Sequence, residues 1–318
     1  MFLTHFQLLL ARNRSTVQTI KKMQLGQHIR GYVLTQWLGS GGMGEVYMAR
    51  HQTTHRQAAV KILYRNDQAA RFRNEAYIQA SVQHAHIAAL YEYTVENGTP
   101  CIIMEYVEGI TLEKLIKRQG RLPESFVWKI FEQIVLAVAH LHGQNIIHRD
   151  LKPGNVKVNR ESVAKLLDFG IAKGIYTPKF TQEGYIVGTS HYMAPEQFQG
   201  KVGIQSDCWA LGVLFYEMLT GQLPFDGRTE TEVRLKIERG QYTDPDLLVS
   251  GMSKRGKRLI QKLLRINPNQ RMSAKELLLE IQNPTPESNF LVTDWMKNIT
   301  DMMEKLPLKG WFKDAKII

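Results

Sequence analysis

The octapeptide HRDLKPGN constrains the fold and the chemistry of this chain more than any other stretch. It brings a carboxylate, an ammonium group and a carboxamide within eight residues, on Asp150, Lys152 and Asn155. The proline and the glycine between the last two of these exclude a regular helix. We therefore expect a loop whose polar groups are turned to one side.

Four shorter motifs flank this loop. Upstream lie the glycine-rich GSGGMG at residues 39–44 and the sequence AAVK, which ends at Lys61. Downstream lie DFG, which begins at Asp168, and APE, which ends at Glu196. A lone G-x-G-x-x-G pattern is weak, but chance coincidence is negligible when all of these motifs occur in this order.

The loop and its flanking motifs resemble the protein kinase family over about residues 32–282. Lysine two residues after the loop aspartate is the serine/threonine pattern, and the residues around the motifs are most similar to the bacterial, eukaryotic-like (Hanks-type) serine/threonine protein kinases. The resemblance implies an α+β, bilobal protein-kinase fold. A small β-rich N-lobe would cover about 31–107 and a larger helical C-lobe about 108–283, with the active site in the cleft.

Two segments lie outside the expected kinase domain of residues 31–283. Residues 1–30 hold five Lys or Arg and no acid, within a net charge of +11, and we expect a basic N-terminal arm that is poorly ordered. Such an arm would attract anionic surfaces, but we prefer a solvated basic tail and do not expect a nucleic-acid partner. Residues 284–318 follow a Pro-Thr-Pro break and carry an apolar helical stripe. There we expect a C-terminal extension with one amphipathic helix, docked on the large lobe or, as second choice, forming a partner surface.

Bulk properties restrict the compartment. No apolar run approaches the roughly 20 residues that span a bilayer. The apolar start of the chain is followed, and not preceded, by basic residues, which is the reverse of a secretory signal. Cys101 and Cys208 lie in apolar surroundings and suit buried thiols in a reducing compartment. We expect a cytoplasmic protein without a transmembrane segment.

Residue patterns predict the main elements. Alternation over residues 32–38 and 45–48 predicts a hairpin, and residues 58–63 read as a buried strand with one charge, Lys61. Apolar residues at intervals of three and four predict a helix over 123–142. The other expected elements are a helix over 69–82, a strand over 101–104, short strands over 156–159 and 163–167, a helix over 206–220 with Asp207 as a cap candidate, and helices near 229–239, 253–265 and 273–282.

The resemblance implies where ATP would bind. Glycines would let backbone N–H groups approach the phosphates without a Cβ in the way. Lys61 would hold the α- and β-phosphates and pair with Glu75. The backbone of residues 105–109 would bond the adenine, with Met104 as gatekeeper. The implied ATP residues are Leu38, Gly39, Gly41, Gly44, Val46, Ala59, Lys61, Glu75, Met104, Glu105, Val107 and Lys157.

The resemblance also assigns the chemistry. Asp150 would accept or orient the hydroxyl proton of a protein substrate, and Lys152 would neutralise charge on the γ-phosphate of ATP. Asn155 and Asp168 would hold Mg²⁺, or Mn²⁺, through oxygen atoms. The implied supports are Thr189 bound to the loop aspartate and lysine, a buried pair of Glu196 with Arg271, and Asp207 beneath the loop backbone.

One residue departs from the family pattern. Strand alternation places Val156 and Val158 on one face and Lys157 on the other. By resemblance, the side chain at 157 lies under the adenine and is normally apolar. A lysine there would lay its methylene groups against the ring and send its ammonium group to water, which puts nucleotide affinity in question more than the fold.

Regulation is expected to act through Arg149. In the family, an arginine beside the catalytic aspartate receives a phosphate from the activation loop, here about residues 171–193. Thr181 lies eight residues before Thr189, where bacterial relatives often carry a phosphorylated threonine. We expect autophosphorylation on Thr181, with Thr177 as the fallback, and dimerisation would allow it in trans.

Two other functions stay open. The first is a pseudokinase, a binding or scaffold module; the intact lysine, aspartates and asparagine of the motifs disfavour it, and Lys157 is its only support. The second is a small-molecule phosphotransferase of kinase-like fold. Residues 189–196 disfavour it because, in the family, this segment shapes a platform for an extended peptide. We therefore expect protein substrates with Ser or Thr acceptors.

Overall fold

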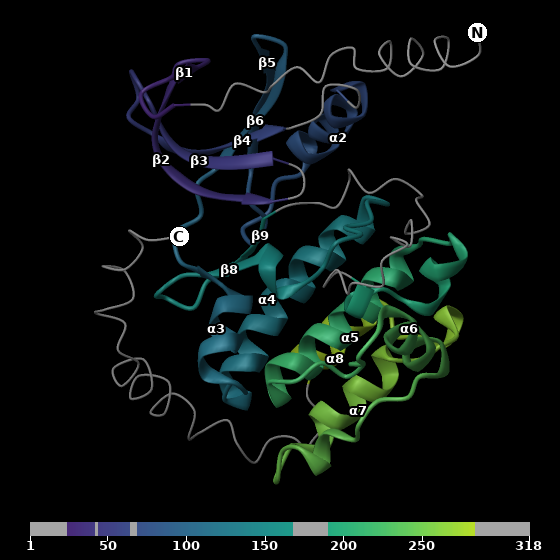
Figure 1. The fold of residues 1–318 in the computed structure, drawn as a ribbon. Helices are drawn as coiled ribbons and strands as arrows, with labels where there is room; N and C mark the ends of the chain where they lie inside the picture. Colours follow the sequence, from purple (N-terminus) through teal and green to yellow (C-terminus); the bar gives the residue numbers. More distant parts are fainter. Residues whose placement is uncertain (1–23, 42–43, 64–68, 168–189, 284–318) are drawn as a thin grey trace, which may run out of the picture. The chain divides into compact units, whose positions relative to one another are not determined.

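The computed structural model describes residues 24–41, 44–63, 69–167 and 190–283 (Figure 1). They divide into two compact units, one of residues up to Ala69 together with Tyr93–Ile103, and one of Ala70–Glu92 together with residues from Met104 onward. Residues 1–23 of the basic arm and the C-terminal amphipathic helix fall outside the described residues, so these parts of the two expectations stay predictions. Residues 24–30 of the arm are described, and the expectation of poor order is wrong for them: His28–Ile29 form β1, which pairs with β2 (Tyr32–Gly41), and Ile29 is buried.

The first unit is built on a six-stranded sheet with the order β1-β2-β3-β4-β6-β5 (Figure 1). β5 and β6 run on into the second unit. Two register shifts bend β2 against β3, one between Leu34 and Gln36 and one between Trp37 and Gly39. The strands are β1 (His28–Ile29), β2 (Tyr32–Gly41), β3 (Gly44–His51), β4 (Gln57–Leu63), β5 (Leu90–Glu96) and β6 (Thr99–Glu105).

The predicted hairpin and the two predicted strands of this unit are confirmed, and β2 and β3 extend further than the sequence pattern indicated. Gly44 opens β3 where the backbones of β3 and β4 come very close. A Cβ on Gly44 would lie 1.9 Å from the carbonyl oxygen of Ile62, so only glycine fits there without a backbone shift. This glycine of the GSGGMG motif is therefore required by the strand pairing itself, whatever its part in binding phosphate.

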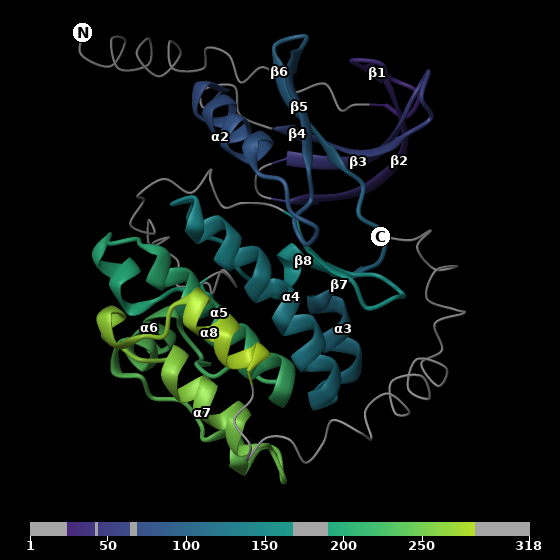
Figure 2. The same cartoon turned by 180° about the vertical axis from the view of Figure 1, so that it is seen from behind.

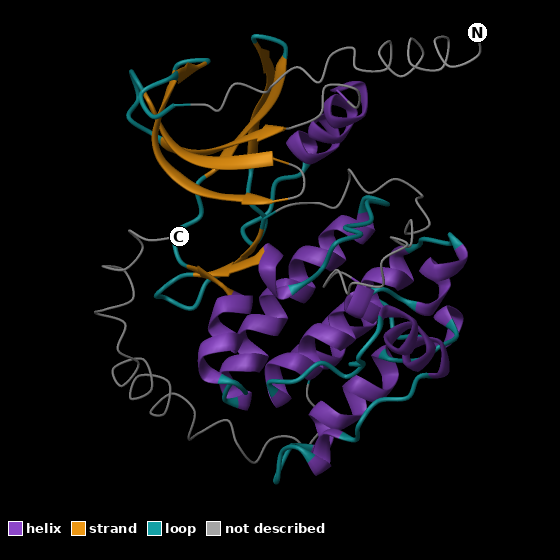
Figure 3. Ribbon diagram, viewed as in Figure 1, coloured by secondary structure: helices purple, strands orange, loops and turns teal. Residues whose placement is uncertain are grey.

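The second unit is mainly helical, and Figure 3 separates its helices from the strands by colour. It also holds a small sheet of order β7-β8-β9, which Figure 2 shows from behind. Its α-helices are α2 (Ala69–Ser81), α3 (Leu112–Gln119), α4 (Glu124–Gly143), α5 (Ile204–Thr220), α6 (Glu230–Arg239), α7 (Lys254–Leu263) and α8 (Ala274–Gln282). Its strands are β7 (Ile110–Thr111), β8 (Val156–Val158) and β9 (Ala164–Leu166), and its short 3-10 turns are η1 (Pro153–Asn155), η3 (Ser190–Tyr192), η4 (Pro195–Gln199), η5 (Pro245–Leu247) and η6 (Pro268–Gln270).

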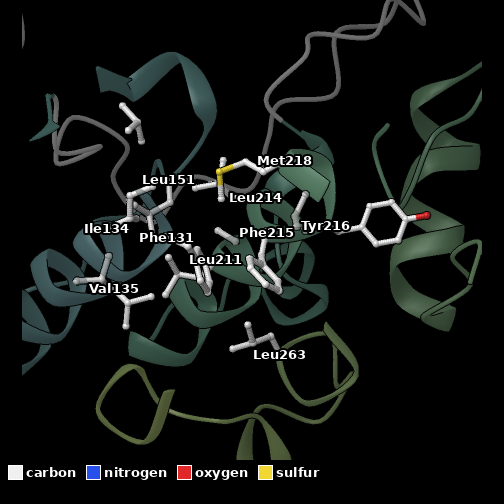
Figure 4. Close-up of a cluster of buried hydrophobic side chains, with 14 of the residues drawn as sticks. Phe131, Ile134, Val135, Leu151, Leu211, Leu214, Phe215, Tyr216, Met218 and Leu263 are labelled. Carbon is white, nitrogen blue, oxygen red and sulfur yellow. The ribbon is translucent and has the colours of Figure 1, made fainter. Parts of the chain in front are cut away.

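The core of the second unit forms where α4 and α5 pack together (Figure 4). Phe131 of α4 stacks on Phe215 of α5, with ring centroids 4.4 Å apart. Leu263 of α7 closes the cluster from another side. The stripe predicted for α4 is buried throughout, and its members are Phe126, Ile130, Ile134, Val138 and Leu141. The α+β architecture expected from the sequence is thus confirmed.

The expected cap of α5 is wrong. The sequence predicts that Asp207 caps this helix, but α5 begins earlier, at Ile204, and its N-cap is Gly203. The hydroxyl of Ser206 accepts the free N–H of Gly203 at 3.3 Å, so no carboxylate is needed there. Asp207 is buried one turn into the helix, where it serves the catalytic loop described below.

Across the described ranges, none of the helices combines the length and the apolar composition that a membrane crossing requires.

Candidate active site

The backbone of the loop at residues 148–155 is held from below by Asp207. One carboxylate oxygen accepts the N–H of His148 at 2.8 Å, and the other accepts the N–H of Arg149 at 2.9 Å. The ring of His142 lies 2.8 Å from the same carboxylate. Arg149 has a φ of 67°, a left-handed conformation that is uncommon outside glycine. The buried carboxylate therefore stabilises an uncommon turn of the loop, and the predicted support by Asp207 is confirmed.

The three chemical groups of the loop converge on Asp150. The Nζ of Lys152 lies 3.0 Å from Asp150 Oδ2, and the amide nitrogen of Asn155 donates to the same oxygen at 2.9 Å. That nitrogen also donates to the Asp150 backbone carbonyl at 2.8 Å. Because both partners are acceptors, the nitrogen of the Asn155 amide must face them, and its oxygen Oδ1 is turned to the other side. The structure thus brings together three residues that the sequence placed in one loop.

The glycine-rich hairpin and the strand lysine form a second group, within the first unit. Gly39 of β2 pairs with Val46 of β3, and Val46 pairs with Lys61 of β4. Ala59 lies two residues before Lys61, so its side chain is on the same face of the sheet as those of Lys61 and Val46. Four of the predicted ATP residues therefore meet on one surface. Leu38 and Gly41 lie on β2 beside them.

The segment that follows β6 carries Glu105, Tyr106 and Val107. The Glu105 backbone bonds Ala89 through an N–H···O contact of 2.8 Å, and a Glu105 side-chain oxygen accepts the Ala89 N–H at 3.1 Å. Met104, the expected gatekeeper, is buried at the end of β6. The segment is thus fixed at its start by one backbone bond and one side-chain bond, both to Ala89.

Lys157 behaves differently from the expectation. Its ammonium group is not sent to water: it donates to the carbonyl of Val107 at 2.9 Å and lies 5.3 Å from the centre of the Tyr106 ring. Burial lowers the pKa of Lys157, and the nearby Lys114 lowers it further, while Glu108 acts in the opposite direction. The side chain was expected to be a solvated cation on an apolar stem, and this is wrong because a backbone acceptor lies within its reach.

The APE motif is anchored by an ion pair. Arg271 donates to both oxygens of Glu196, at 2.8 and 3.1 Å, and the arginine side chain is fully buried. Ser206 also donates to Glu196, at 2.9 Å. The predicted pair of Glu196 with Arg271 is confirmed.

Several predicted site residues lie outside the described part of the chain. They are Asp168, Thr177, Thr181 and Thr189, together with the side chain of Glu75, whose backbone belongs to α2. Their assigned roles stay predictions.

The comparison with protein families decides the identity. The family model described as "Protein kinase domain" matches residues 32–280. The chain belongs to the protein kinase family. Its residues 32–280 are called the kinase domain below.

Relatives and solved structures agree with the kinase domain. Serine/threonine-protein kinase PrkC of Bacillus subtilis is 39% identical over 221 residues, which are 67% of this chain and 34% of that protein. Serine/threonine-protein kinase PknB of Mycobacterium tuberculosis is 36% identical over 282 residues, 83% of this chain and 45% of that protein. The chain thus spans between a third and a half of the length of these relatives. A crystal structure of Rad53 1-466 in complex with AMP-PNP matches with a TM-score of 0.69 and 28% identity, covering 78% of this chain and 64% of that one.

The kinase domain also holds a half-buried carboxylate that the sequence analysis missed. Glu217 of α5 accepts the hydroxyl of Tyr192 at 2.6 Å. Burial raises the pKa of Glu217 to about 7; the Tyr192 hydrogen bond opposes this rise, and the nearby Glu113 adds to it. The available signal was a single acid within the apolar run of α5.

This carboxylate makes the stability of the kinase domain depend on pH. The pKa of Glu217 is about 7 in the folded state, against an ordinary 4.5, so the folded state binds more protons than the unfolded chain between these values. The free energy of unfolding therefore falls as pH rises through this window. We expect Glu217→Gln to match the wild type near pH 4.5 and to be more stable by roughly 1–3 kcal/mol at pH 8. Urea unfolding at the two pH values tests this, and an equal difference at both would contradict it.

Proposed function

We propose that this chain transfers the γ-phosphate of ATP to serine and threonine hydroxyls of proteins. The observation that carries the proposal is the convergence of Lys152 and Asn155 on Asp150, on a loop that a buried carboxylate holds in place. A positioned carboxylate, a cation and an amide oxygen are the groups that phosphoryl transfer requires, because this reaction depends on alignment and charge neutralisation. The similarity to PrkC and PknB, both serine/threonine-protein kinases, supports the choice of serine and threonine.

Each group has a proposed part in the reaction. Asp150 would accept or orient the proton of the attacking hydroxyl, which must come within hydrogen-bond reach of its carboxylate. Lys152, held 3.0 Å from that carboxylate, would neutralise charge on the transferred phosphoryl group. Lys61 would hold the α- and β-phosphates over the face that it shares with Val46 and Ala59. The nucleotide in the Rad53 complex, AMP-PNP, supports a nucleotide as the second substrate.

The residues present fit a magnesium ion. The orientation of the Asn155 amide turns a hard oxygen away from Asp150, and Mg²⁺ prefers such ligands. In the described ranges, no group of three or more His, Cys, Asp or Glu side chains suits a metal ion. The ion would be held by Asn155 and Asp168. When bound, it would neutralise phosphate charge.

The organisation around the kinase domain is also a proposal. We infer a kinase domain over residues 31–283, slightly wider than the family match, with an N-lobe to about residue 107, an extension at 284–318 and a basic arm at 1–30 whose His28–Ile29 form β1 of the sheet. A cytoplasmic location is supported by the two cysteines, Cys101 and Cys208, which are free and buried, as is usual in a reducing compartment. The proposed partners are protein substrates, and a second copy of the chain for phosphorylation in trans.

Purified protein tests the proposal directly. The protein is incubated with γ-labelled ATP and Mg²⁺, alone and with generic protein substrates, and a matched reaction contains EDTA. Label that enters protein in the presence of Mg²⁺ and is lost with EDTA is the expected result. No transfer, with retained nucleotide binding, would instead favour the pseudokinase, the alternative that the unusual residue type at position 157 raised.

Activation is expected to depend on Thr181. Phosphate on this residue would add roughly −1.5 to −2 charge, which Arg149 would bind through charge-assisted hydrogen bonds. We expect Thr181→Ala to lower transfer to an added substrate several-fold without a change in unfolding midpoint. Arg149→Ala should remove most of the gain from phosphorylation. An unmodified segment 171–193 in active protein, measured by mass spectrometry, with full activity of Thr181→Ala, would refute this.

A further inference from the structure

Two lysines of the small sheet reach the same short segment. Lys157 of β8 and Lys165 of β9 are directly paired across the strands. Like charges in such positions repel each other unless each has its own partner. Lys165 pairs with the Glu105 carboxylate at 2.5 Å, and Lys157 donates to the Val107 carbonyl at 2.9 Å. The two ammonium groups thus hold the segment at positions 105 and 107, on either side of Tyr106.

The surroundings of the Lys157 ammonium make this contact specific. The group lies 5.3 Å from the centre of the Tyr106 ring, a distance at which a cation is attracted to the ring face. The side chain is half-buried, so the ammonium group gives up part of its water and gains the carbonyl and the ring in return. Without the ammonium group, the Val107 carbonyl would lose its charged donor. The contact is therefore specific and fixes the position of the Lys157 ammonium group.

We propose that Lys157 is a positioning residue for the nucleotide base. Its ammonium group fixes the Val107 carbonyl and so holds the backbone of residues 105–107 in the shape that binds the base. Its methylene stem is then free to face the ring of the base. This proposal rests on the proposed function, since it assumes that a nucleotide binds at the segment. From the sequence, Lys157 was a residue that puts nucleotide affinity in question, and its proposed effect is the opposite.

Three variants test the proposal. Lys157→Met keeps the length of the stem and removes the donor, and Lys157→Arg keeps a donor. Lys114→Met is the matched control. It removes an exposed lysine of α3 whose charge acts on Lys157. Two quantities are measured for each: the Kd for ADP by calorimetry, and hydrogen exchange of the peptide that covers residues 105–109 in the absence of nucleotide. The KM for ATP and kcat are measured in parallel.

We expect Lys157→Met to raise the Kd for ADP about tenfold, which is about 1.4 kcal/mol. Exchange over 105–109 should become faster, and the KM for ATP should rise while kcat at saturating ATP stays within about twofold. Lys157→Arg should recover most of the affinity, and Lys114→Met should match the wild type.

Other outcomes overturn the proposal. Wild-type affinity of Lys157→Met would show that the donor is dispensable. Weaker binding with unchanged exchange would assign Lys157 to direct contact with the base, and faster exchange with unchanged affinity would make its role structural only. A wild-type protein that binds no ADP would contradict the proposed function. The exchange measurement would then report only whether Lys157 orders residues 105–109.

Discussion

Replacement of Asp150 by asparagine is expected to reduce phosphate transfer at least about a hundredfold, with the protein still folded. General-base and proton-orienting groups contribute about 10²–10⁴-fold to such rates. Asparagine keeps the size of the side chain and an acceptor for Lys152, but it removes the negative charge and the ability to take a proton. The initial rate with labelled ATP, measured beside the urea unfolding midpoint, separates lost chemistry from lost structure.

The matched control for this variant is Asp246→Asn. Asp246 lies in η5 and is exposed, and it pairs with Lys257 at the surface. Asp246→Asn should leave both the rate and the unfolding midpoint close to the wild type, because exposed ion pairs contribute little to stability. An Asp150→Asn protein with half or more of the wild-type rate would show that the loop carboxylate has another role.

The largest loss of stability is expected from Arg271→Met. The guanidinium group is fully buried, donates to both oxygens of Glu196, and also donates to the Arg265 carbonyl at 3.0 and 3.1 Å. The substitution leaves a carboxylate without its cation and carbonyl groups without a donor. Removal of one partner from such a pair costs about 3–5 kcal/mol. The free energy of unfolding, measured with urea, should therefore fall by about 3–5 kcal/mol, and the unfolding midpoint should fall with it.

A surface pair on the same unit supplies the comparison for this prediction. Arg234 bonds Glu238 at 2.9 Å, one turn apart on α6, with about a third of each side chain exposed (33% and 31%). Arg234→Met should cost about 0.7–1.5 kcal/mol, because it removes a pair in this position and also the contact of the guanidinium group with the Phe198 ring, 5.2 Å from the ring centre. If Arg271→Met proved as mild as Arg234→Met, the buried pair would not anchor the APE motif.

Local patterns were enough to predict much of the fold. The apolar residues of α4 repeat every three or four positions because one face of the helix is buried against α5, so the sequence pattern predicts the buried face. The catalytic loop was predictable for a different reason. Its three groups are close in sequence, so their convergence on Asp150 needs only a turn at Pro153.

Other features depend on contacts between distant residues and left weaker signals. The direction of the Lys157 ammonium follows from a carbonyl 50 residues earlier, which no periodicity encodes. Asp207 was expected at a helix start, where acids often cap, but the requirements of the loop backbone 58 and 59 residues earlier decide its position. The burial of Glu217 depends in the same way on Tyr192, which approaches it from another segment.

The central claim is that Asp150 directs phosphate from ATP to serine and threonine hydroxyls, and analysis of the labelled amino acids tests it most directly. A generic protein substrate is labelled by the wild-type protein and by Asp150→Asn, then hydrolysed, and the phosphorylated amino acids are separated. Phosphoserine or phosphothreonine from the wild-type reaction, and at most about a hundredth as much from the variant, is the predicted result. Label that is confined to tyrosine, or equal label from both proteins, would contradict the account.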